Sequence, residues 1–248
     1  MTARTIQAIE SVYDARAAFP VDGNSYREDV RRDIALLRRS GVRPADFVCD
    51  VGCGIGWHLA ALYGLGYRQL YGIDLSAASL QAFRKRSQAA RNGKICLLHG
   101  DVCTWHTREF FDVVTSFLCC LGAFSPAGDR RYLRSLRQIT RPGGLIVFSC
   151  FAKEEAQTLQ GQTRVRYSDS SAVTIESAVR FNRRSSDLII SQTSSAGGRV
   201  PDERIRLYSV AGVAALAQSS GIQIEQVLPP IAKVNEPSAR LTIVGRAG

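Results

Sequence analysis

The stretch FVCDVGCGIGWHLAAL, residues 47–62, joins a β-branched and apolar run to three alternating glycines and then to a helical pattern. The apolar run predicts a short buried strand. The glycines predict a tight turn in which the backbone can approach a ligand, because they carry no side chain. The fold and the function of the chain depend on which ligand this turn holds.

A dinucleotide is the first candidate ligand, and the spacing of the glycines argues against it. Dinucleotide-binding folds use G-x-G-x-x-G, in which the third glycine allows close packing of helix on strand. Here the glycines are Gly52, Gly54 and Gly56, and Trp57 occupies the position of that third glycine. Asp74 lies 22 residues after Gly52 and suits any cofactor that carries a ribose diol. We therefore expect no NAD-type cofactor.

The composition is that of an ordinary globular protein, with 248 residues, 45% hydrophobic and 22% charged. No apolar run reaches eighteen residues, and the first residues lack the continuous apolar core of a signal peptide. The seven cysteines show no C-x-x-C pair, so we expect small buried residues in a reducing compartment and no metal site. These features predict a cytoplasmic protein without a membrane span.

The net charge of +10 raises the question of a nucleic-acid partner. Arg130, Arg134, Arg137 and Arg141 recur at three- and four-residue steps, which is typical of the solvated face of an amphipathic helix. The charge alone therefore does not favour nucleic acid.

The order of predicted elements indicates a parallel sheet with helices on both faces, because strands alternate with helices. After residue 151 the pattern changes to strands joined by turns, and a helix and two strands close the chain. We predict helices at 3–18, 25–40, 57–66, 76–91, 129–140 and 210–221, and strands at 46–52, 69–76, 94–101, 110–117, 143–150, 172–195, 203–209, 222–228 and 240–246. This order divides the chain into a helical cover (1–45), a nucleotide-type domain (46–152 and 208–248) and an inserted antiparallel flap (153–207).

Three further stretches accompany the glycine turn and Asp74: LLHGD (97–101), FFDVV (110–114) and RPGGLIVFSC (141–150). In this order and at these distances they resemble the motifs of the class I S-adenosylmethionine-dependent methyltransferases. The resemblance covers roughly residues 46–151, and the closing helix and strands extend it to residue 248. It implies an α/β fold with a Rossmann-like seven-stranded methyltransferase sheet, two N-terminal helices and an inserted antiparallel flap. It also implies an enzyme that uses S-adenosyl-L-methionine and releases S-adenosyl-L-homocysteine.

The resemblance gives each acid at a strand end a role. Asp50 matches the residue that fixes the methionine amino group, and Asp74 the residue that accepts from both ribose hydroxyls. Asp101 matches the acid that accepts from the exocyclic amine of adenine. Asp112, at the start of a strand, is expected to be structural.

The backbone and apolar positions of the same motifs also carry over. The peptide backbone of Gly52, Gly54 and Gly56 would approach the cofactor. Leu75 would line the adenine face, and the Val102 N–H would donate to the ring. The positions expected to open onto the methyl group are Ser116, Phe117 and Leu118. Packing in the core is an equal alternative for Phe117 and for Phe124.

The end of the fourth strand indicates the acceptor class. Enzymes that methylate amino groups of nucleic-acid bases tend to carry Asn/Asp-Pro-Pro-aromatic there, whereas this chain has TSFLCCLGAF, residues 115–124. That stretch resembles small-molecule methyltransferases. VYDARAAFPVDGNSYREDV (12–30) and RIRLYSVAGVAALAQSSGI (204–222) resemble stretches of amino-sugar and glycine/sarcosine-type N-methyltransferases.

This second resemblance implies that Tyr13 and Tyr26 lie over the methyl-transfer site and that Arg204, Arg206 and Tyr208 belong to the flap that holds the acceptor. A structural role is an equal alternative for each of them. The catalytic base is unknown from the sequence, with Tyr13 and His58 as candidates. His99 and His106 are further conceivable bases, each with a structural alternative.

We therefore predict methyl transfer to the nitrogen or oxygen of a small-molecule acceptor, by an in-line displacement that depends on positioning. Two alternatives stay open: an RNA or DNA methyltransferase, and a homologue that binds the cofactor without transferring the methyl group. We expect no nucleic-acid partner and no membrane partner, and a homodimer is left open.

Overall fold

The computed structural model describes residues 3–17, 24–105, 107, 110–117, 121–155, 163–167, 174–195, 199–229 and 240–248. Its helices are α1 (Ala3–Ala17), α2 (Asn24–Arg39), α3 (Trp57–Gly64), α4 (Ala77–Arg86), α5 (Gln88–Arg91), α6 (Pro126–Ile139) and α8 (Val210–Gln218). Its strands are β1 (Val48–Val51), β2 (Leu70–Asp74), β3 (Cys96–His99), β4 (Phe111–Ser116), β5 (Thr140–Phe151), β6 (Thr163–Tyr167), β7 (Thr174–Asn182), β8 (Asp187–Ser194), β9 (Arg199–Arg206), β10 (Ile222–Leu228) and β11 (Arg240–Ala247).

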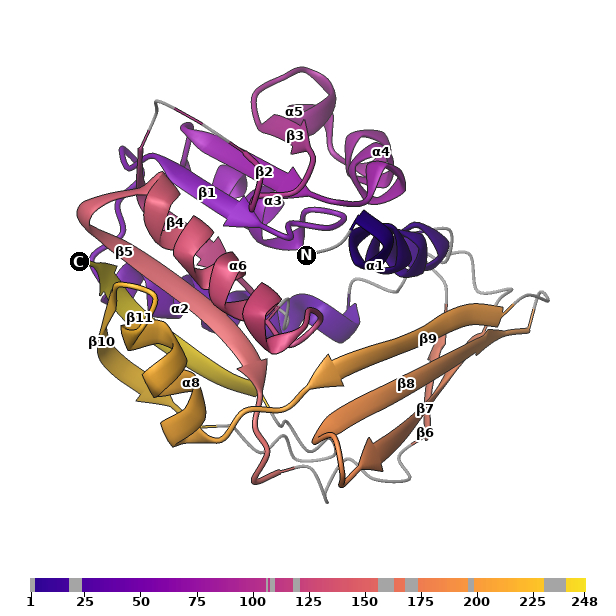
Figure 1. Cartoon of the computed structure of the whole chain (residues 1–248). Helices are drawn as coiled ribbons and strands as arrows, with labels where there is room; N and C mark the ends of the chain where they lie inside the picture. The colour runs from indigo at the N-terminus through magenta and orange to yellow at the C-terminus, as the bar shows by residue number, and fades with distance from the viewer. Residues whose placement is uncertain are drawn as a thin grey trace.

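The strands form two sheets (Figure 1). The larger has seven strands in the order β10-β11-β5-β4-β1-β2-β3, in which β5, β4, β1, β2 and β3 run parallel and β11 and β10 pair antiparallel. The smaller sheet, β6-β7-β8-β9, is antiparallel and lies between β5 and α8 in the chain. We call it the flap sheet. The predicted fold class is confirmed.

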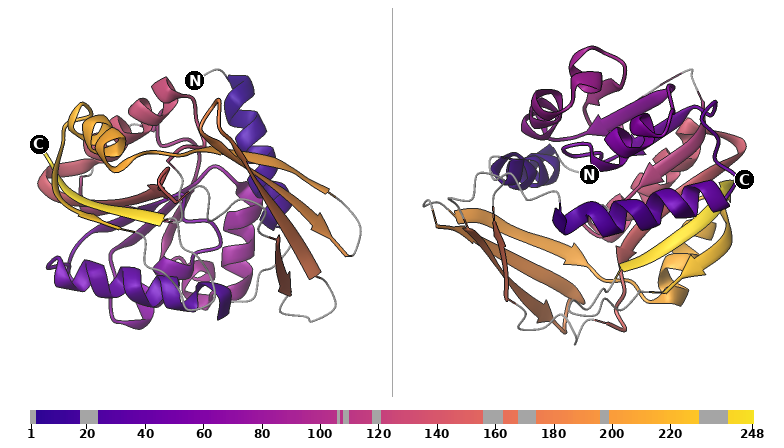
Figure 2. Two further views of the ribbon diagram at one scale, coloured as in Figure 1. Left: turned by 90° about the horizontal axis from the view of Figure 1, so that it is seen from below. Right: turned by 180° about the vertical axis from the view of Figure 1, so that it is seen from behind.

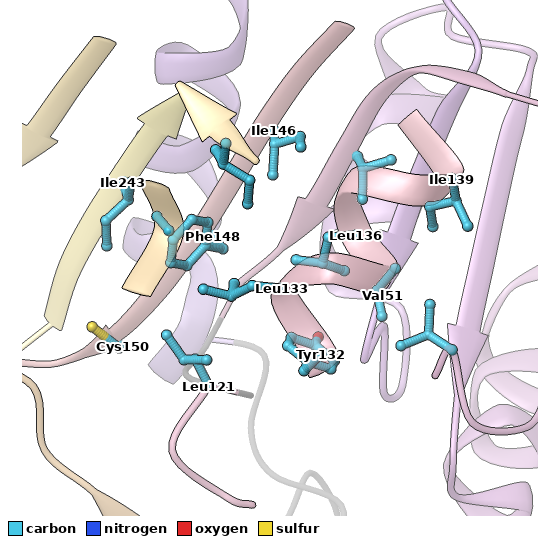
Figure 3. Packing of buried hydrophobic residues seen from close by; sticks show 14 of the residues in the cluster. Val51, Leu121, Tyr132, Leu133, Leu136, Ile139, Ile146, Phe148, Cys150 and Ile243 are labelled. Carbon is cyan, nitrogen blue, oxygen red and sulfur yellow. The ribbon is translucent and has the colours of Figure 1, made fainter. Parts of the chain in front are cut away.

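Strict alternation in the central strands builds two cores, one on each face of the large sheet. Ile146, Phe148 and Cys150 of β5 pack with α6 and α8 in one cluster (Figure 3). Leu145 and Val147 point the other way, into a cluster with α2, α3 and α4. Because successive side chains of a strand face opposite sides, one apolar run serves both cores. The helices on the two faces are visible in Figure 2.

Three details of the predicted elements are wrong. The single helix expected over 76–91 is α4 and α5, separated at Ser87, whose extended backbone ends α4 and whose hydroxyl accepts from the Ala90 N–H. The strand β6 has no counterpart among the predicted strands. The strand expected over 203–209 begins earlier, because β9 already starts at Arg199.

In the described part of the chain, no helix is long and apolar enough to cross a membrane.

The glycine turn between β1 and α3 has a backbone that only glycine adopts without strain. Gly52, Gly54 and Gly56 have φ values of 72°, 53° and 79°. At Gly56 space is also lacking, because a Cβ would lie 2.2 Å from ring atoms of Phe83 on α4. The turn is therefore fixed both by its dihedral angles and by helix packing.

Replacing Gly56 with Ala adds a steric clash to the backbone strain, so we expect the free energy of unfolding to fall by about 2–4 kcal/mol. Gly66 is the matched control, because its φ is 93° but a Cβ added there would meet no atom within 4 Å. Gly66→Ala should cost only about 1 kcal/mol. Urea denaturation of both variants measures the difference, and equal losses would show that the Phe83 contact adds nothing.

Candidate active site

The candidate site lies at the carboxyl edge of the parallel strands. β1 is central, with β2 on one side and β4 on the other. The chain leaves β1 toward β2 and reaches β4 only later, and in open α/β sheets ligands bind outside the carboxyl ends of the strands at such a switch point. Asp50 near the end of β1, Asp74 at the end of β2 and Asp101 beyond β3 meet at this edge.

Asp74 ties the glycine turn to the end of β2. Its Oδ2 accepts from the Gly54 N–H at 2.6 Å, and its Oδ1 accepts from the Ser76 N–H at 2.8 Å. Burial raises the pKa of Asp74, and these two backbone bonds offset part of that effect. Each carboxylate oxygen has a second lone pair, so the acid can still accept from a diol.

Asp50 is almost completely buried, with 2% of its surface exposed. Its Oδ1 accepts from the Thr115 hydroxyl on β4 at 2.7 Å. Burial raises the pKa of Asp50 to about 6, although the nearby His58 and the Thr115 bond lower it. A cationic ligand group would favour the ionised carboxylate.

Asp101 has an unfilled position for a hydrogen-bond donor. Its Oδ1 accepts from the Cys103 N–H at 2.8 Å, whereas its buried Oδ2 has no hydrogen-bond partner among the described residues. A buried oxygen without a donor costs about 1–3 kcal/mol. An amine donor on a ligand would remove this cost. Val102 is buried beside it, and Leu75 is half-buried at the end of β2.

Helix α1 lies beside this edge (Figure 1). The Ser76 hydroxyl, which also caps α4, donates to Asp14 at 2.6 Å. The neighbouring Tyr13 hydroxyl donates to Glu203 of β9 at 2.9 Å, and Arg16 forms an ion pair with the same carboxylate. Helix α1 therefore bridges the turn after β2 and the flap sheet.

The segment that follows β4 is fixed to the flap sheet by Asp129, which is fully buried in the first turn of α6. Asp129 accepts from the Gly122 N–H at 3.0 Å and from the Tyr208 hydroxyl. The Arg206 guanidinium lies 3.5 Å from Asp129 and donates to the Phe124 carbonyl at 2.9 Å. These contacts give Arg206 and Tyr208 structural partners.

The other predicted site residues lie around this edge or away from it. Ser116 shares a hydrogen bond with Tyr132, Phe117 is buried, and Asp112 accepts from the Phe47 N–H in the structural role expected for it. Arg204 is largely exposed, on the opposite face of β9 from Glu203, and lies 3.9 Å from Asp187. His99 contacts the Leu75 carbonyl at 2.9 Å. The Tyr26 side chain, Leu118 and His106 lie outside the described residues.

The structure thus brings Asp50, Asp74 and the glycine turn together, with Asp101 at the same edge. The roles of these acids and glycines in cofactor binding stay predictions. The same holds for the predicted contacts of an acceptor with Tyr13, Tyr26, Arg204 and Arg206. Residues that the sequence reasoning missed are Asp33, Asp129, Glu203 and Arg240. The sequence did hold a signal for Asp33. It is an acid on the apolar face of α2, between Val30 and Leu37, where a charged side chain indicates a buried partner.

Comparison with known proteins agrees with this geometry. Residues 48–144, which include β1, the glycine turn and the three acids, match the model of a family described as a methyltransferase domain. The match to a methyltransferase domain thus extends over residues 48–144 of the chain. The Asp101 oxygen without a donor would fit the adenine amine of S-adenosyl-L-methionine, and the glycine turn and Asp74 would fit its ribose.

Solved structures share the fold of this chain over most of its length. An S-adenosylmethionine-dependent methyltransferase from Clostridium acetobutylicum superposes with a TM-score of 0.70 at 16% identity, over 90% of this chain and 92% of that one. CalS10 of Micromonospora echinaspora, an amino pentose methyltransferase solved with S-adenosylmethionine bound, has a TM-score of 0.69 at 18% identity, over 91% and 93%.

A curated sequence relative is named for its action on tRNA. This relative, a tRNA U34 carboxymethyltransferase of Idiomarina loihiensis, is 32% identical over 123 residues, which are 48% of this chain and 37% of that relative. Alignments to the curated relatives span between 14% and 53% of their lengths.

The pKa of Asp50 predicts a pH dependence of cofactor binding. If Asp50 holds the methionine ammonium group, the protonated acid must lose its proton before it binds. The Kd for S-adenosyl-L-homocysteine should therefore rise as pH falls through about 6, by up to tenfold per pH unit. Calorimetric titrations between pH 7.5 and pH 5 measure this slope.

Asp50→Asn is the control, because the amide keeps the shape of the side chain and does not titrate. The variant should bind more weakly at pH 7.5 and show a flat profile. A wild-type Kd that stays constant down to pH 5 would exclude this role for Asp50.

Proposed function

We propose that the protein transfers the methyl group of S-adenosyl-L-methionine to an amine nitrogen of a small polar acceptor. The observation that supports cofactor binding is the set of three acids at the carboxyl edge of the sheet. One of them, Asp101, has a buried oxygen without a hydrogen-bond donor among the described residues. The bound cofactor supplies a methyl group already activated by its sulfonium. The protein then needs chiefly to bind, to orient and to exclude water.

The flap sheet supports a polar acceptor. Three adjacent strands carry the buried side chains Ser177, Gln192 and Glu203 on one face. Gln192 donates to the Ser177 hydroxyl at 3.0 Å, and Glu203 faces Tyr13 of α1. Burying polar side chains costs free energy unless they form hydrogen bonds. The hydroxyl and amino groups of a polar ligand would form further hydrogen bonds with this face, so the face suits such a ligand.

Glu203 supports an amine as the acceptor group. Only 8% of its surface is exposed, and its carboxylate is paired with Arg16 and Tyr13. A small amine is protonated at neutral pH and would be attracted to this carboxylate. It would then release that proton to solvent, so that its nitrogen lone pair attacks the methyl group while the carbon–sulfur bond of the sulfonium breaks. The likeness of the fold to an amino pentose methyltransferase is consistent with this acceptor class.

An RNA acceptor is the second candidate, because the relative from Idiomarina loihiensis is a tRNA-modifying enzyme by name and the net charge is +10. The two candidates differ in a direct assay. Purified protein is incubated with radiolabelled S-adenosyl-L-methionine and either a panel of amino sugars and small amines or bulk tRNA. Label in a small amine supports the proposal, and label in tRNA alone overturns the acceptor class.

Cofactor binding should depend on Asp74. Asp74→Ala removes a charge-assisted acceptor worth about 1.5–3 kcal/mol, so we expect the Kd for S-adenosyl-L-methionine to rise by about 10- to 100-fold. Glu225→Ala, at an exposed ion pair on the far strand β10, should leave the Kd unchanged. Calorimetry on both variants tests this, and unaltered binding by Asp74→Ala would exclude the acid from the site.

Acceptor binding should depend on Glu203. Glu203→Gln keeps the size of the side chain and removes its charge, so we expect the KM for an active amine to rise about tenfold. The Kd for S-adenosyl-L-homocysteine should stay within about twofold of wild type. Arg204→Gln, on the opposite face of β9, is the comparison variant that distinguishes an amine acceptor from an anionic one. A rise in KM in that variant alone would indicate an anionic acceptor held by Arg204.

A further inference from the structure

A fully buried acid joins the flap sheet to the part of the chain that carries the cofactor edge. Asp129, in the first turn of α6, uses both of its carboxylate oxygens. Oδ1 accepts from the Gly122 N–H at 3.0 Å, and Oδ2 accepts from the Tyr208 hydroxyl at 2.5 Å. The Arg206 guanidinium lies 3.5 Å from Oδ2. Gly122 lies between β4 and α6, whereas Arg206 ends β9 and Tyr208 follows it, so one carboxylate holds two segments that are far apart in the chain.

The same two segments also meet backbone to backbone. The Arg206 N–H donates to the Gly122 carbonyl at 2.8 Å, and the Arg206 guanidinium donates to the Phe124 carbonyl at 2.9 Å. Gly122 has a φ of 102°, and a Cβ added there would lie 2.4 Å from the carbonyl oxygen of Arg206. Glycine allows this close approach because it has no side chain. The position of β9 relative to residues 121–124 is therefore closely set.

The Tyr208 hydroxyl is the donor in its bond to Asp129. Burial and the adjacent Asp129 carboxylate raise the pKa of Tyr208 above its usual value, so the hydroxyl keeps its proton. Burial raises the pKa of Asp129 as well, and the hydrogen bonds from Tyr208 and Gly122 offset part of that rise. Tyr208 is therefore no general base toward an acceptor, because its proton is held between the two side chains.

Each of the two segments leads to one half of the proposed site. β4, which ends at the cofactor edge, is tied to α6 by the hydrogen bond between Ser116 and Tyr132 at 2.7 Å. Asp129 precedes Tyr132 on the same helix. β9 carries Glu203 three residues before Arg206, which is roughly 10 Å along an extended strand. Asp129 thus connects the end of β4 with the strand that carries the proposed acceptor carboxylate.

A second buried acid, Asp33 of α2, has partners of a different kind. Arg240 of β11 donates to both of its oxygens, at 2.8 and 2.7 Å, and Nε2 of His58 on α3 lies 3.0 Å from its Oδ2. These three side chains belong to the large sheet and to the helices on the face opposite α6. The network around Asp33 therefore stabilises the domain of the large sheet, whereas Asp129 links that domain to the flap sheet.

We propose that Asp129 is a positioning residue for methyl transfer. Through Tyr208 and Arg206 it holds Glu203 at a fixed distance from the cofactor edge. This rests on the proposed function in that Glu203 binds the acceptor amine. Without the Tyr208 hydroxyl, the buried carboxylate would draw the Arg206 guanidinium toward itself and away from the Phe124 carbonyl. Glu203 would move with the same strand, and a misplacement of about 1 Å can slow a reaction that depends on positioning by about 100-fold.

The test is a double-mutant cycle of Tyr208→Phe and Glu203→Gln, measured as kcat/KM for an amine that the wild type methylates. Tyr208→Phe removes one hydroxyl, and the backbone bonds of residue 208 to Phe151 and Lys153 remain. We expect each single variant to lower kcat/KM about tenfold, and the double variant to lower it by no more than about twentyfold, because both changes act through Glu203. The Kd for S-adenosyl-L-homocysteine should stay within about twofold of wild type in Tyr208→Phe.

Tyr67→Phe is the matched control, because it also removes one buried tyrosine hydroxyl, which donates to the Val42 carbonyl at 3.0 Å on the α2 face of the large sheet. It should lower the unfolding temperature and leave kcat/KM unchanged. A change of kcat/KM in Tyr67→Phe as large as that in Tyr208→Phe would overturn the inference, because loss of stability would then explain both.

Two further outcomes separate the inference from the proposed function. Losses that multiply to about a hundredfold in the double variant, or an unchanged kcat/KM in Tyr208→Phe, would overturn the inference and leave the proposed function intact. An absence of turnover with every small amine would overturn both. Should Tyr208→Phe fail to fold, Arg206→Gln takes its place in the same cycle and is judged by the same criteria.

Discussion

The arrangement at the carboxyl edge depends on one constraint, the burial of three carboxylates where neighbouring parallel strands end. Each carboxylate must find donors or lose its charge. Asp74 finds two backbone N–H groups, Asp50 finds the Thr115 hydroxyl and lies near His58, and Asp101 finds one donor for two oxygens. The glycine turn, the capping serine and the pairing of β1 with β4 all supply these donors. Among the described contacts of these three acids, the oxygen that still lacks a donor is Oδ2 of Asp101.

Helix α1 is held differently from the rest of the molecule. Its described side chains include one that is buried and apolar, Val12, and its contacts to the turn after β2 and to the flap sheet are hydrogen bonds and ion pairs. Segments with few buried apolar contacts open at lower free energy than the core. Ile9 of α1 nevertheless packs against one core cluster, so the helix is held by apolar as well as polar contacts.

The sheet, the glycine turn and the acids at strand ends could be predicted because each is encoded within a few residues, by periodicity, by glycine and by position after an apolar run. The network around Asp33 could not, because its partner Arg240 lies 207 positions away. Glu203 meets Tyr13 across 190 positions for the same reason. The break at Ser87 was missed because a serine inside a helical pattern caps or continues a helix according to its surroundings. The contact between the flap sheet and α1 is therefore long-range and leaves no motif in the sequence.

The tie between Asp33 and Arg240 also has a consequence for biosynthesis. β11 follows every other strand of the large sheet in chain order, so a growing chain presents Asp33 and His58 before their cationic partner exists. Until β11 inserts beside β5, an uncompensated acid sits against an apolar surface, a state that burial disfavours. The ion pair between Asp33 and Arg240 is thus completed by the last strand of the sheet to be synthesised.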